Sequence, residues 1–151
     1  MPIVSTDLHI VDFGLSQFLH DKIDSKVSID SNAEINRNQF FSSRWVLKGH
    51  PYTKRDDVIA IVYNLLFLMD PTESWFEKYM QVPYLDTIKF KLKATNEELC
   101  SGQRCSCMVP LFEEAYSYSI NEKPNYGKMV HLLKKELIKI YCVPDKIFSF
   151  L

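Results

Sequence analysis

The chain has 151 residues, of which 46% are hydrophobic and 25% are charged, and its formal net charge at pH 7 is -1. This length suits one domain that buries about two-thirds of the surface exposed by the unfolded chain. A charge so close to zero argues against binding nucleic acid or an anionic membrane over the whole surface. No run of about eighteen apolar residues indicates a membrane span.

The first residues, MPIVSTDLHIVDF, lack a basic segment and a small-residue cleavage site, so they do not have the features of a secretory signal. We therefore expect an intracellular protein, cytoplasmic by default. Residues 8–12 alternate and then become apolar, which predicts a short strand. Asp12-Phe13-Gly14 ends it, and the glycine permits a sharp change of chain direction.

Periodicity is lost from about residue 15 to about residue 45, where polar residues predict a long loop. A loop of this length inside a compact domain is usually functional or disordered. After it, Asp56 and Asp57 precede the apolar run VIAIVYNLLFLM, and either aspartate can cap a helix. We expect this helix over about residues 57–69. Because it is apolar on every side, it should be central to the core.

The second half of the chain contains further helical patterns. Trp75 and Phe76 fall in an expected connecting segment, whereas residues 84–93 form an amphipathic stretch that we interpret as a helix. Another helix is expected around LFEEAYSYS. The last predicted helix covers about residues 124–141, where apolar residues recur at i, i+3, i+4 and i+7, with Pro124 at its start.

The cysteines raise the question of a metal site. Three of the four lie in the segment CSGQRCSC, at positions 100, 105 and 107, and the fourth is Cys142. A structural zinc ion usually takes paired ligands separated by about two to four residues, and the histidines here are scattered. Reduced thiols in and around a helix are the better interpretation, and zinc remains the alternative.

Several motifs occur in an order that is typical of protein kinases. The segment HIVDFGLSQFL contains Asp-Phe-Gly and is followed by the long loop, an Arg-aromatic pair and the apolar helix. Seven such segments lie in order between residue 9 and about residue 141: HIVDFGLSQFL, SRW, KRDDV, the apolar helix, SW, TNEELC and EKPNY. Together they resemble the casein kinase I family, and the vaccinia-related kinases are the nearest alternative subfamily.

The resemblance implies a role for particular residues. Asp12 takes the place of the aspartate that ligates magnesium, and Phe13 and Gly14 belong to the same nucleotide-site motif. Asp57 matches the structural aspartate at the start of the central helix. Arg44, with Lys91 or Lys93, lies where the family holds an anion. A solvated basic face is the alternative interpretation for the two lysines.

The resemblance implies a mainly α fold, namely a kinase C-lobe with a short β element at its N-terminus and no N-lobe. Residues 1–151 would then form a single partial kinase domain. The sequence contains no glycine-rich loop, no strand lysine before Asp12 and no His-Arg-Asp. Phosphoryl transfer depends on the positioning that these parts provide.

We therefore expect a catalytically inactive pseudokinase lobe that needs neither ATP nor magnesium by itself. Loss of an N-lobe would leave a face open, and we expect a protein partner to cover it. Two alternatives remain: the C-terminal part of an active serine/threonine kinase whose N-terminal half is supplied separately or is missing, and an unrelated fold with a zinc site.

Overall fold

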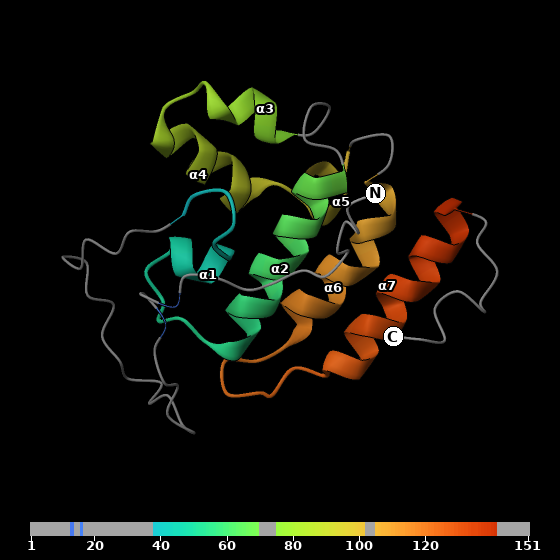
Figure 1. Ribbon diagram of the computed structural model, residues 1–151. Helices are drawn as coiled ribbons and strands as arrows, with labels where there is room; N and C mark the ends of the chain where they lie inside the picture. The colour runs from blue at the N-terminus through green and yellow to red at the C-terminus, as the bar shows by residue number, and fades with distance from the viewer. Residues whose placement is uncertain (1–12, 14–15, 17–37, 70–74, 102–104, 142–151) are drawn as a thin grey trace, which may run out of the picture.

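The computed structural model describes residues 13, 16, 38–69, 75–101 and 105–141 (Figure 1). These residues are mainly helical, which confirms the expected fold class in its coarse form, and they contain no strand. The strand expected over residues 8–12, with Asp12 and Gly14, lies outside the described residues, as does most of the loop expected over about residues 15–45. The helices are, in chain order, α1 (Arg44–Leu47), α2 (Lys54–Met69), α3 (Trp75–Met80), α4 (Tyr84–Lys93), α5 (Asn96–Leu99), η1 (Ser106–Met108), α6 (Val109–Ser117) and α7 (Tyr126–Tyr141).

Helix α2 occupies the centre of the described part of the chain (Figure 1). It lies side by side with α6, and α7 packs on α6 in turn. The expected central helix is therefore present, beginning at Lys54. Buried side chains from α2 and α6 form the middle of the core: Ile59, Val62, Tyr63, Leu66, Leu111, Phe112 and Ala115. None of the helices in the described residues is long and apolar enough to cross a membrane.

The expectation that α2 is buried on every side is wrong for one of its faces. Ile61 is 55% exposed and Leu68 is 66% exposed, and they share this face with the exposed Asp57 and Asn64. The spacing 57, 61, 64, 68 places all four residues on one side of a helix. We call this group the open α2 face. The other side of α2 faces α6 and the core.

A cluster of aromatic rings joins α3 and α4 to the core. Trp75 and Phe76 stack with ring centroids 4.2 Å apart, and Phe76 also meets Phe67 of α2 at 5.3 Å. Phe40 lies within 6.2 Å of both Trp75 and Phe76. The connecting segment expected at residues 75–76 is therefore the start of α3, because burial of these two rings holds the first helical turn in place.

The start of α2 is organised around the buried carboxylate of Asp56. It accepts hydrogen bonds from the Thr53 backbone N–H at 2.9 Å, from the Thr53 hydroxyl at 2.6 Å and from the Ser43 hydroxyl. The Ser43 hydroxyl also accepts a hydrogen bond from the Val46 N–H, which caps α1. One carboxylate therefore links two helix N-termini. Of the two aspartates expected to be able to cap this helix, Asp56 makes these hydrogen bonds, whereas Asp57 is exposed at the open α2 face.

The short helices are set by caps that periodicity does not detect. Helix α5 has a capping box, in which Thr95 and Glu98 each bond the backbone N–H of the other. Helix α7 begins two residues after Pro124, and the Asn125 side chain accepts a hydrogen bond from the Lys128 N–H at 2.9 Å. Asn125, not Pro124, therefore marks the start of the last helix.

The neighbouring aspartates Asp56 and Asp57 provide a direct test of this organisation. Asp56→Ala leaves three buried donors without their acceptor, and we expect it to lower the free energy of unfolding by about 2–4 kcal/mol. Asp57→Ala removes only an exposed charge from the first helical turn, so we expect a change below about 1 kcal/mol. Urea denaturation followed by circular dichroism measures both. Equal losses in the two variants would contradict the assignment.

Candidate functional site

The residues expected to form a nucleotide site are mostly outside the described part of the chain. This holds for Asp12 and Gly14. Phe13 is described and is 67% exposed, and its carbonyl accepts a hydrogen bond from the Ser16 N–H at 2.9 Å. Asp57, at the open α2 face, has a pKa that is raised by desolvation and by the neighbouring Asp56.

The anion site was expected from Arg44 with Lys91 or Lys93, and Lys91 is not available for it. Lys91 is fully buried, and its ammonium group donates hydrogen bonds to the carbonyls of Phe40 and Ser42, each at 2.7 Å. It also lies 3.7 Å from the centroid of the Tyr63 ring. Since its donors point at backbone oxygens inside the protein, Lys91 does not reach an external anion.

Arg44 lies beside Lys91 but is also engaged by the protein. Its Nε donates to the Lys91 carbonyl at 3.0 Å, and its Nη2 donates to the Asn96 side chain at 3.2 Å. The guanidinium carbon sits 4.8 Å from the centroid of the Tyr116 ring. Arg44 therefore ties α1 to the end of α4 and the start of α5. The geometry supports a structural role for both cations.

Burial changes the acid–base properties of this region. Desolvation lowers the pKa of Lys91 well below its ordinary value, and the charge of Arg44 lowers it further. The Tyr63 and Tyr116 hydroxyls lie 3.2 Å apart, and desolvation raises the pKa of both phenols. Tyr63 and Tyr116 therefore stay protonated over the physiological range, which leaves Lys91 as the group with a pKa shifted toward neutrality.

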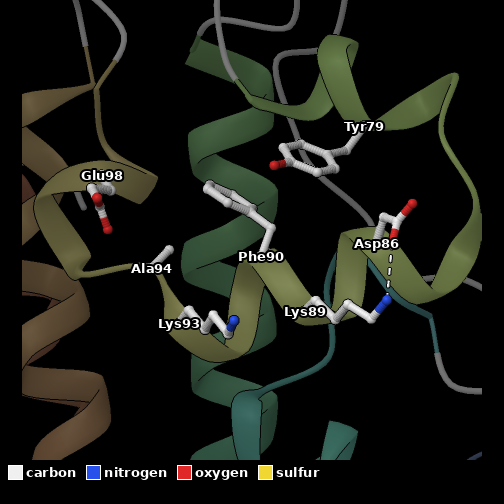
Figure 2. Close-up of a pocket in the computed structure, with 7 residues that line it drawn as sticks. All are labelled: Tyr79, Asp86, Lys89, Phe90, Lys93, Ala94 and Glu98. Carbon is white, nitrogen blue, oxygen red and sulfur yellow. Dashed lines mark hydrogen bonds and ion pairs between the residues drawn. The ribbon is translucent and has the colours of Figure 1, made fainter.

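Lys93 has a different environment from Lys91. It is exposed, and it lines a hollow of about 360 Å³ between α3, α4 and α5 (Figure 2). The stacked rings of Tyr79 and Phe90 form part of this hollow, with centroids 4.5 Å apart. The remaining lining residues are Asp86, Lys89, Ala94 and Glu98. This hollow was not predicted from the sequence, although Lys89 and Lys93, spaced i and i+4, indicate one shared helix face.

The three described cysteines form no disulfide, and they lie at the end of α5, just before η1 and within η1. Cys100 and Cys105 are buried, Cys107 is half-buried, and Cys142 lies outside the described residues. Desolvation raises the pKa of Cys100 to about 12, and that of Cys107 is raised for the same reason. Within residues 38–69, 75–101 and 105–141, no group of three or more His, Cys, Asp or Glu residues could hold a metal ion.

Comparisons were made with protein-family models, with curated proteins and with solved structures, and no match was found in any of the three. The likeness to casein kinase I therefore rests on the seven segments of the sequence. Two surface features remain as candidates for binding, namely the open α2 face and the hollow beside α4, whereas half-buried Arg44 and buried Lys91 make contacts within the protein.

Lys91 should give the free energy of unfolding a recognisable pH dependence. The unfolded chain binds more protons than the folded chain between the lowered pKa and the ordinary value of 10.5. Stability should therefore rise with pH in this window, by up to about 1.4 kcal/mol per pH unit, and fall as the pH is lowered. We expect Lys91→Met to remove this slope in urea denaturation as the pH is lowered from 10.5.

Lys93→Met is the matched control, since Lys93 is on the same helix but exposed. It should keep the pH slope of the original chain. If both variants have the same slope, the buried position of Lys91 does not cause the pH dependence.

Proposed function

We propose that the chain is a non-catalytic, casein kinase I-like pseudokinase lobe that acts as an intracellular binding or structural subunit of a larger assembly. The ordered segments from HIVDFGLSQFL to EKPNY support the kinase-like part of this proposal. The sequence has no glycine-rich loop and no His-Arg-Asp, so the groups that grip phosphate and accept the substrate proton are absent from it.

The exposed apolar residues of the open α2 face are the main support for a role in binding a partner. A helix that is apolar on every side in sequence normally lies inside a core. Here Ile61 and Leu68 remain more than half exposed on its outer side. Covering this face would remove apolar surface from water, at about 25 cal/mol for each Å². A protein partner that packs on α2 is therefore the proposed occupant.

The proposed binding role of the open α2 face can be tested by introducing one charged side chain into it. Ile61→Glu places a carboxylate on an exposed position of α2, so the folded state should lose less than about 1 kcal/mol. A charge inside an apolar interface should weaken partner binding about tenfold or more. We expect the variant to bind less anilinonaphthalene sulfonate, a dye that fluoresces on apolar surface. We also expect it to lose proteins that the original chain captures from cell extract.

Val130→Glu is the matched control. Val130 is β-branched and 50% exposed on α7, and α7 is a 16-residue helix like α2. The Val130→Glu variant should bind the dye and capture proteins from cell extract as the original chain does. If Ile61→Glu and Val130→Glu behave alike, the open α2 face is not the interface.

The same proposal predicts that the chain does not bind nucleotide. We expect no change in the melting temperature on adding ATP with magnesium, because ATP in kinases is held between two lobes and by groups that this sequence lacks. Differential scanning fluorimetry with and without magnesium measures this.

A magnesium-dependent rise of the melting temperature would instead favour the alternative, in which the chain is one half of an active serine/threonine kinase. The intact Asp12-Phe13-Gly14 is the feature that supports this alternative. It predicts casein phosphorylation when the chain is mixed with a kinase N-lobe fragment.

A further inference from the structure

The hollow beside α4 has a rigid apolar floor. The Tyr79 and Phe90 rings face each other at an angle of 17°, and Phe90 also packs on Trp75 with centroids 5.4 Å apart. Ala94 contributes only a methyl group beside them (Figure 2). Aromatic rings held in this way offer a surface on which a further ring can stack or pack by its edge.

The rim of the hollow carries charges of both signs, but most of them are already engaged. Lys89 pairs with Asp86 at 3.3 Å on one side of the rings (Figure 2). On the other side, a Glu98 oxygen accepts a hydrogen bond from the Thr95 N–H at 2.7 Å as part of the α5 cap. Among the described residues, Lys93 has no ion-pair or hydrogen-bond partner. The one uncommitted charge at this rim is therefore positive.

The shape of the hollow favours a protein segment over a small molecule. The Lys89 and Asp86 side chains at its edge are 68% and 53% exposed, so the walls are low. Sites for small molecules usually bury about 70–90% of the ligand surface. A peptide needs to place only one side chain in such a hollow, since its other residues can lie along the rim.

We propose that this hollow binds a segment of a partner protein in which an aromatic residue is flanked by acidic residues. The aromatic ring lies on Phe90 and Tyr79, and a neighbouring carboxylate pairs with Lys93. Complementary charge gives such a contact its selectivity, and the ring gives it apolar contact area. The hollow uses no residue of α2, so this proposal stands or falls independently of the kinase-like assignment.

The test uses the full chain and three fluorescein-labelled peptides. The probe is Gly-Ser-Glu-Phe-Glu-Ser, and its comparators carry Ala in place of Phe or Lys in place of both Glu residues. We expect fluorescence anisotropy to show the probe binding about fivefold or more tightly than either comparator. Amide chemical shifts of the isotope-labelled chain should change around Tyr79, Phe90 and Lys93.

Charge changes at Lys93 complete the experiment. Lys93→Gln should weaken probe binding about fivefold, and Lys93→Glu should reverse the preference toward the Lys-containing peptide. Lys54→Gln, at an exposed lysine of α2, is the control and should leave binding unchanged. Equal binding of the three peptides would overturn the proposal. So would shift changes elsewhere, or full affinity in Lys93→Gln.

Discussion

The arrangement of the helices depends on one buried ammonium group. Lys91 reaches from α4 to the carbonyls of Phe40 and Ser42, just before α1, and lies against the Tyr63 ring of α2. Three parts of the chain that are far apart in sequence therefore meet at a single atom. Burial of a cation is costly, and here carbonyl dipoles and an aromatic face offset that cost. Displacing the segment before α1 would leave the charge without those partners.

This constraint explains why the expected anion site does not form. A lysine that already satisfies its donors inside the protein cannot also neutralise an external phosphate. Residues two apart on a helix point to nearly opposite sides, so Lys91 faces inward while Lys89 and Lys93 share the outer face. Because residues 84–93 were expected to form an amphipathic helix, their pattern already predicted that Lys91 lies on the opposite side from Lys89 and Lys93. The resemblance to casein kinase I implied Lys91 or Lys93 beside Arg44 because it depends on the position of a residue along the chain and not on the direction of its side chain.

The long helices α2 and α7 could be predicted because their periodicity extends over many residues. The short helices α1, α3 and α5 could not, since each is held by a local cap or by buried rings. Ser43 is one example: its hydroxyl caps α1 only because Asp56 holds it in place. The open α2 face was also beyond prediction, because an apolar sequence does not reveal which neighbours are present to cover it. Which of Asp56 and Asp57 accepts the buried hydrogen bonds at the start of α2 likewise depends on where Ser43 and Thr53 lie, and the sequence does not reveal their positions.

The buried thiols can be used to measure local opening of the folded structure. With a pKa of about 12, Cys100 is ionised to roughly one part in 10⁵ at neutral pH, and its sulfur is shielded from solvent. A thiol-labelling reagent can therefore react with it at an appreciable rate only during transient openings of the structure around the end of α5. The labelling rate then measures the free energy of that opening. The core around Cys100 and Cys105 can thus be followed locally, while global unfolding is followed by other means.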